Sequence, residues 1–168
     1  GFASVDQGAM REATRAVSVM LMLIGGSSGS TAGGLKTVTA TVLLLAAVAG
    51  ARGKNHVQVF KRSVSDWQVR DAMSIAVSMV LLCFVGAIVL SVDSNVSFLN
   101  SLFETASALG TVGLTANVTP FLQLPSKIML IAFMYFGRVG VLTISLGFLM
   151  GDRAAGRFRY AETRLLIG

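Results

Sequence analysis

Residues 103–115 read Phe-Glu-Thr-Ala-Ser-Ala-Leu-Gly-Thr-Val-Gly-Leu-Thr, and this stretch determines how the rest of the chain is interpreted. The apolar segment that leads into it, residues 98–109, is too short to cross a bilayer, because a spanning helix needs about 20 apolar residues. Gly110 and Gly113 follow immediately. A short helix, an irregular turn and a return to the same side of the membrane form a re-entrant loop, which this stretch predicts.

A second copy of the same pattern lies upstream. Ser18–Gly25 aligns without gaps with Leu102–Leu109, and residues 26–31 (Gly-Ser-Ser-Gly-Ser-Thr) align with residues 110–115. The offset is constant at 84 residues, the separation of Gly29 from Gly113. Internal repeats of this kind are typical of membrane pores and transporters. The alternative, two short helices lying on the lipid surface, remains open from the pattern alone.

The content and distribution of charge favour a membrane protein. Only 13% of the residues are charged, whereas a soluble domain has about 25%. Lysine and arginine gather within residues 52–70 and 153–164, and none occurs from Asp93 to Ser126. Basic zones separated by uncharged apolar segments follow the positive-inside rule. The net charge of +6 therefore does not form the single basic face that nucleic-acid binding requires.

The long apolar segments predict a multi-pass topology. Residues 72–92 give about 31 Å of helix, enough to cross the hydrocarbon core. Residues 128–150 are equally apolar and are interrupted only by Arg138. Residues 35–50 would form about 24 Å of helix, which barely spans, so we expect a break or a contribution from the next segment. With the basic segment 51–71 in the cytoplasm, both re-entrant loops open to the outside and the C-terminus is cytoplasmic.

The two glycine-rich turns offer the groups that a dehydrated monovalent cation needs. Such an ion is held by a ring of closely spaced oxygen atoms, which backbone carbonyls and Ser or Thr hydroxyls supply. Glycine allows the backbone to adopt the conformations that turn carbonyls toward an ion. A short helix before the turn directs its negative C-terminal end at the same point. The repeats therefore predict two pore loops of an ion pathway.

Three motifs together resemble the Trk/Ktr/HKT superfamily of potassium transporters. They are residues 103–115, residues 29–37 (Gly-Ser-Thr-Ala-Gly-Gly-Leu-Lys-Thr) and residues 136–140 (Phe-Gly-Arg-Val-Gly), and the chain is most similar to the C-terminal half of a bacterial Ktr membrane subunit. The resemblance implies an all-α integral membrane fold of helix–pore-loop–helix repeats, four of which surround one pore. The first two filter strands are absent from this chain, which begins Gly1-Phe2 without Met, so we expect it to be part of a longer protein.

On this resemblance the chain divides into two units. Residues 1–65 are the third pore repeat without its first helix, with a pore loop at 17–34, a second helix at 35–50 and a basic cytoplasmic segment. Residues 66–168 are the fourth repeat, with a helix at 72–92, a pore loop at 97–116, a helix at 126–150 and a basic cytoplasmic tail.

We expect the potassium filter to contain four residues from each loop: Ser28, Gly29, Ser30 and Thr31, with Thr111, Val112, Gly113 and Leu114. Ser107, one turn back on the short helix, is expected to matter less. The resemblance also places Arg138 below the filter as a gate, against a break of the preceding helix at 46–53, where Gly50 and Gly53 permit an irregular turn. The alternative is a structural arginine that neighbouring carbonyls satisfy.

The implied partners and location also follow from the resemblance. We expect a homodimer in the plasma (inner) membrane, seated on cytoplasmic nucleotide-binding regulatory subunits that contact residues 51–65 and the tail. Potassium is the transported substrate, coupling to sodium or protons stays open, and no covalent cofactor is expected.

Other classes of function fit less well. Residues 29–37 approach a phosphate-binding P-loop, but Leu35 separates Gly34 from Lys36, whereas the motif needs Gly-Lys-Ser/Thr in succession. The single histidine, His56, lies in the basic segment, so no Ser–His pair for catalysis is suggested. Glu104 is interpreted as a hydrogen-bonding group behind the filter or at the outer mouth. A non-conducting structural subunit remains an alternative, although it would not account for the matched loops.

Overall fold

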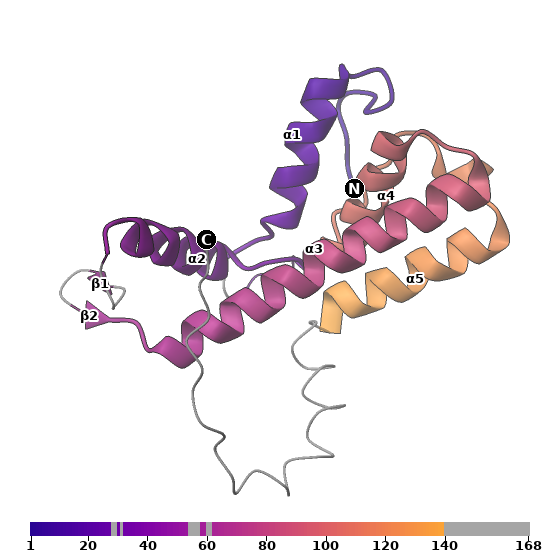
Figure 1. Cartoon of the computed structure of the whole chain (residues 1–168). Coiled ribbons are helices and arrows are strands. Elements are labelled where there is room, and N and C mark those ends of the chain that lie inside the picture. The colour runs from indigo at the N-terminus through magenta and orange to yellow at the C-terminus, as the bar shows by residue number, and fades with distance from the viewer. Residues whose placement is uncertain (28–29, 31, 54–57, 60–61, 140–168) are drawn as a thin grey trace, which may run out of the picture.

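The computed structural model describes residues 1–27, 30, 32–53, 58–59 and 62–139. Expected filter residues Ser28, Gly29 and Thr31 therefore lie outside the described residues, as do the tail and the second half of the helix expected at 126–150. The described chain is helical, as predicted, with the order shown in Figure 1. Its elements are α1 (Glu12–Leu23), α2 (Thr37–Ala51), β1 (Gln58–Val59), β2 (Arg62–Ser63), α3 (Asp66–Ser94), α4 (Phe98–Leu109), the 3₁₀ turn η1 (Thr119–Phe121) and α5 (Leu124–Val139).

Helix α3 is the longest element, at 29 residues, and it contacts α2, α4 and α5, whereas α1 stands away from it and packs on α4 (Figure 1). It begins at a capping box, in which the Gln68 side chain accepts a hydrogen bond from the Ser65 backbone N–H at 3.3 Å. It ends at Asn95, which adopts the left-handed conformation. It extends beyond the expected range of 72–92 because its polar ends are also helical. Among the described helices, α3 is the one long and apolar enough to cross a membrane by length and composition.

The core lies around α4, which contacts α1, α3 and α5. Every residue from Phe103 to Leu109 is buried, and Phe103 is 0% exposed. Complete burial of such a side chain contributes about 1.5–3 kcal/mol. Helix α5 runs beside α3 and approaches it closely, since a Cβ at Gly86 would lie 2.3 Å from Phe133 Cε2. A buried hydroxyl, Ser126, donates to Asp93 at the far end of this helix pair.

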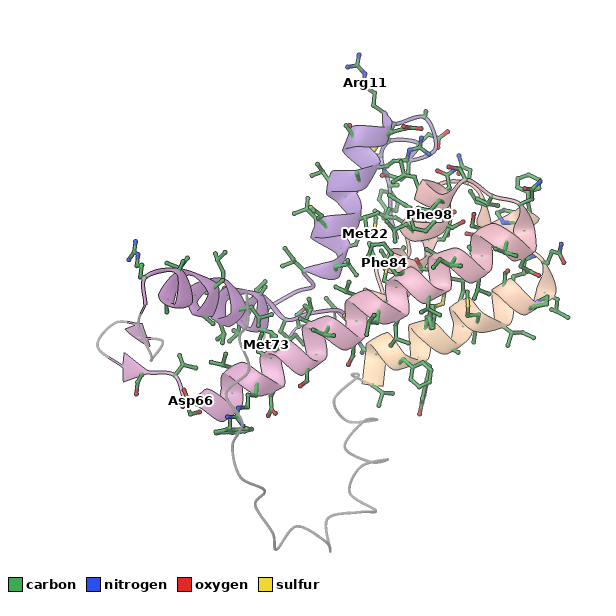
Figure 2. All side chains as sticks on the ribbon, viewed as in Figure 1. Arg11, Met22, Asp66, Met73, Phe84 and Phe98 are labelled. Atoms are coloured by element: carbon green, nitrogen blue, oxygen red, sulfur yellow. The ribbon has the colours of Figure 1, made fainter. Side chains whose placement is uncertain are left out.

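The outer surface of α3 is apolar. Large exposed hydrophobic side chains run along its length, among them Met73 and Phe84, which are labelled in Figure 2. Phe84 also packs against Phe98 at the start of α4, with ring centroids 6.3 Å apart. A continuous apolar face of this kind indicates contact with lipid or with further protein.

The segment between α1 and α3 differs from expectation at its C-terminal end. Helix α2 continues without interruption to Ala51, so the irregular turn that we placed at 46–53 is wrong for most of its length. Gly50 is helical and Gly53 alone adopts a positive φ, of 66°. The run of alanine, leucine and valine before Gly50 favours helix strongly enough to carry a single glycine. Beyond it, β1 and β2 pair as a short antiparallel ladder.

Candidate functional site

The candidate site begins where α4 ends. Gly110 N–H donates to Ala106 O at 2.8 Å and Thr111 N–H donates to Ala108 O at 3.1 Å, so the last carbonyls of the helix are used by the turn that follows. Thr111 then has a φ of 52° and Gly113 a φ of 83°. Glycine adopts this region readily, but a β-branched residue at positive φ is an outlier whose cost is about 1–3 kcal/mol. Thr111 must therefore be held in place by its surroundings.

Ser107 of α4 is hydrogen-bonded to the turn through both its side chain and its backbone carbonyl. Ser107 Oγ donates to Leu114 O at 2.6 Å, and Ser107 O accepts from Val112 N–H at 2.9 Å. The carbonyl of Leu114, which we expected in the filter, is thus bonded to the short helix. Ser107 is accordingly bonded directly to the turn, and the expectation that its mutation matters less than that of its neighbours stays a prediction.

Glu104 forms a clamp behind the same segment. Its Oε1 accepts hydrogen bonds from Thr115 Oγ1 at 2.5 Å and Ala116 N–H at 3.0 Å, and its Oε2 accepts from Thr119 Oγ1 at 2.8 Å. The side chain is 4% exposed. Hydrogen bonds to an ionised carboxylate are roughly twice as strong as neutral ones. The interpretation of Glu104 as a hydrogen-bonding group behind the loop is confirmed.

The first loop folds back beside the end of α1. Leu35 N–H donates to Leu23 O at 3.0 Å, and Thr37 N–H donates to Gly26 O at 3.2 Å. Lys36 Nζ turns toward the loop interior, where it donates to Ala32 O at 2.8 Å and Ser30 O at 3.3 Å. The carbonyl of Ser30, the one expected filter residue of this loop that is described, is therefore engaged by an ammonium group.

The structure brings the two loops together. Gly33 N–H of the first loop donates to Thr111 Oγ1 of the second at 2.7 Å. A Cβ at Gly110 would lie 2.7 Å from Met22 O, so the end of α4 also touches the end of α1. At the other ends of these helices Arg15 Nη1 donates to Asn100 Oδ1. Sequence analysis missed Gly33 and Lys36, although both lie within the motif 29–37 that we had singled out.

The expected gate residues lie in two different places. Arg138 is in the last turn of α5, next to Gly137, where a Cβ would lie 2.0 Å from Leu109 O. That turn of α5 is therefore in direct contact with the C-terminal end of α4. Gly50 lies inside α2 and Gly53 after it, and a Cβ at either position would have nothing within 4 Å.

The site offers backbone carbonyl and hydroxyl oxygens together with the carboxylate of Glu104. In the described part of the chain no group of three His, Cys, Asp or Glu residues is placed to hold a metal ion. A pocket lies between α4, the segment after the turn and α5, and its lining includes Ser107, Thr111 and Gly113. Of the oxygen atoms around the turn, Leu114 O accepts from Ser107 Oγ and Thr111 Oγ1 accepts from Gly33 N–H.

Comparison with known proteins identifies the family of the chain. Residues 1–154 match the TrkH family model, described as a cation transport protein. The chain is 37% identical over 168 residues to the Ktr system potassium uptake protein B of Bacillus subtilis, and 38% identical over 173 residues to the potassium/sodium uptake protein NtpJ of Enterococcus hirae. Each match covers 100% of this chain, which spans 37% and 38% of those relatives. The chain belongs to the TrkH family of cation transport proteins.

Proposed function

We propose that this chain supplies two pore loops of a potassium uptake pathway in a membrane, as part of a longer Trk/Ktr-type subunit. The observation that supports the proposal best is the turn after α4, where Thr111 and Gly113 adopt left-handed conformations while Ser107 and Glu104 hold the flanking segment. A fixed turn of this kind can present carbonyl oxygens to an ion. The family is a transporter family, and the named activity of the relatives supports potassium as the substrate.

In this proposal α4 and α1 are pore helices and the segments after them are filter strands. The C-terminal end of α4 carries partial negative charge, which stabilises a cation beyond it. Thr111, Val112 and Gly113 remain the proposed filter positions of the second loop, and the corresponding positions of the first loop are those predicted from the repeat. α3 would span the membrane, because it is long enough and presents an apolar surface along its length, and α5 would span beside it as the apolar run 128–150 predicts.

The wider assembly is also a proposal. We expect two full-length subunits to form a dimer on cytoplasmic nucleotide-binding regulators, which would contact residues 51–65 and the basic tail. The relative named as a potassium/sodium uptake protein suggests a direct test of coupling. Rubidium uptake by the full-length transporter should be measured with and without sodium, and at two external pH values, in cells that lack other potassium uptake systems.

The test of the proposed function is Gly113→Ser in the full-length transporter. Gly113 has a φ of 83°, which is unfavourable for a residue with a side chain. Serine at this position should therefore shift the backbone that presents the carbonyl oxygens. We expect discrimination of potassium over sodium to fall about tenfold, the ratio that a loss of about 1.4 kcal/mol gives. The measurement is competition of potassium and sodium against rubidium uptake, normalised to protein in the membrane.

A matched control is available in the same chain. Gly50→Ser changes the same residue type within α2, where a Cβ meets no atom within 4 Å. It should leave ion discrimination unaltered. Unchanged discrimination in Gly113→Ser, with normal amounts of protein, would remove this turn from the filter and favour a non-conducting structural role.

A further inference from the structure

The contact between the two loops rests on a buried backbone donor. Gly33 is buried, and its N–H donates to Thr111 Oγ1 at 2.7 Å. A buried N–H group without an acceptor is costly, so nearly all of them are paired in folded proteins. Here the acceptor is a side chain 78 residues away in the sequence, on the neighbouring loop. The bond therefore links the conformation of one loop to that of the other.

The fit around Gly33 is close on two sides. A Cβ at this position would lie 2.8 Å from both Oγ1 and Cγ2 of Thr111, and 2.8 Å from the backbone oxygen of Gly137 in α5. Real Cβ atoms essentially never approach other atoms so closely. Gly33 is thus enclosed by the second loop and by α5, and a side chain at this position would clash with Thr111.

Thr111 is the residue that needs such a restraint. Its φ of 52° is unfavourable for a β-branched side chain, and its own N–H is bonded to Ala108 O. Strained backbone conformations persist only where the surroundings determine them. The bond from Gly33 holds the side chain of Thr111, while the bond to Ala108 holds its backbone.

We infer that the Thr111 side chain is a tether between the two pore loops, and that Gly33 positions the second filter strand through it. The inference rests on the proposed function and adds to it that ion discrimination at residues 111–113 depends on a residue of the other repeat. Thr111 acts here as a positioning residue, because its hydroxyl oxygen accepts the Gly33 N–H. Discrimination should consequently be lost when either partner of the bond is removed.

The first experiment compares Thr111→Val with Thr111→Ser in the full-length transporter. Valine keeps the shape of threonine but has no acceptor, whereas serine keeps the hydroxyl. We expect Thr111→Val to lower potassium-over-sodium discrimination about tenfold, as the loss of one buried hydrogen bond would. Thr111→Ser should stay within about twofold of the parent. Thr41→Val is the matched control, because it removes an exposed hydroxyl that bonds only within α2, to Thr37 O.

A double-mutant cycle separates a tether from a direct ion ligand. The partner variant must remove the N–H without adding atoms, because a Cβ at Gly33 would also lie 2.8 Å from the Gly137 backbone oxygen. Glycolic acid at position 33 replaces the N–H by an ester oxygen, and it should also lower discrimination about tenfold. If the two residues act through one bond, combining this ester with Thr111→Val should be no worse than the more severe single variant.

The outcomes distinguish the inference from the proposed function. Effects that multiply to about a hundredfold in the double variant would show that Thr111 and Gly33 act independently, which overturns the tether. Parental discrimination in Thr111→Val, with normal protein in the membrane, would overturn it as well. If the parent transporter took up no rubidium, or if potassium did not compete with that uptake, the proposed function would be overturned instead. The tether depends on that function.

Discussion

At the residue scale, the site depends on polar side chains that bond the backbone of the second loop. Ser107, on α4, bonds Val112 and Leu114 within the predicted filter strand. Glu104, on the same helix, bonds residues 115–119 that follow the strand. Both side chains are hydrogen-bonded to the loop itself, so they support its backbone. The selectivity of such a loop would therefore be set as much by the residues that fix its backbone as by the residues that face the ion.

Glu104 gives a prediction in which hydrogen bonding and charge have different consequences. Glu104→Gln keeps an oxygen for the Thr115 hydroxyl and the Ala116 N–H, and the Thr119 hydroxyl can rotate to accept from the new amide. Glu104→Ala removes every one of these bonds, each worth about 1.5–3 kcal/mol to a charged group. We expect Glu104→Gln to keep ion discrimination within about threefold and Glu104→Ala to abolish it or to lower membrane abundance. Rubidium uptake per transporter is the measurement, and equal defects in both variants would indicate that the negative charge itself is required.

Arg138 gives a second prediction at this scale. An arginine near the bilayer midplane costs about 2.5–3.5 kcal/mol on insertion scales, so it should face protein or the ion pathway. It lies beside the contact between α5 and the end of α4. As a gate, its bulk and positive charge would oppose a cation moving from the filter toward the cytoplasm. Arg138→Ala should therefore raise the maximal uptake rate about threefold or more and leave ion preference unaltered.

The same measurement can contradict the gate. Maximal rate and half-saturating potassium concentration should be determined in the same cells, together with the amount of protein in the membrane. If Arg138→Ala only reduces that amount and uptake per molecule is unchanged, the arginine is structural.

At the element scale, α2 is an unbroken helix through most of the range 46–53, where the sequence predicted an irregular turn. The helix continues through Gly50 to Ala51, and the irregular backbone starts only at Arg52. Alanine stabilises a helix relative to glycine by about 0.5–1 kcal/mol, so Gly50→Ala should be neutral or slightly stabilising. Gly53 has a φ of 66°, where a side chain is strained, so Gly53→Ala should be the more disruptive change.

This pair of variants is compared by uptake rate and by thermal stability of the purified transporter. We expect parental uptake in Gly50→Ala and a lower melting temperature in Gly53→Ala. A faster or slower maximal rate in Gly50→Ala alone would indicate that α2 opens at Gly50 during transport, as the sequence-based expectation of a broken helix requires.

The contact of α4 with three other helices explains why the loop after it is so well determined. α4 buries Ser101 and all of residues 103–109, whereas α2 buries none of its residues. An element that is buried on all sides has little freedom to change its ends. The second loop is thus bonded to a buried helix. The described part of the first loop is held mostly by bonds within its own repeat, and Gly33 N–H adds a bond to Thr111 Oγ1.

At the scale of the whole molecule, the chain spans 37% of the length of the Bacillus subtilis relative. Two pore loops cannot surround an ion, and the open side would leave polar backbone groups exposed to lipid, at several kcal/mol each. We expect residues 1–168 alone to give no growth of a potassium-uptake-deficient bacterium on limiting potassium. The full-length transporter serves as the positive control, and clear rescue by residues 1–168 would contradict the four-repeat arrangement.

The sequence by itself determined the family of the protein and the position of the short helix α4. The apolar segment 98–109 became α4 at those same residues, because helix formation there depends on local composition and on the glycine that ends it. The motifs 103–115 and 29–37 led to the family that the comparisons show. The extent of α3 was underestimated, because counting apolar residues overlooks polar ends such as the capping box at Ser65.

Only the tertiary structure decided which atoms near the loops are already occupied. Sequence spacing could not show that Ser107 bonds Leu114 O, that Lys36 bonds Ala32 O, or that Gly33 bonds Thr111, because the last pair is brought together by the packing of α1 against α4. A repeat in the sequence predicts that two loops have similar shapes. How those loops touch depends on side-chain volumes and backbone contacts between distant segments, and local sequence does not encode these directly.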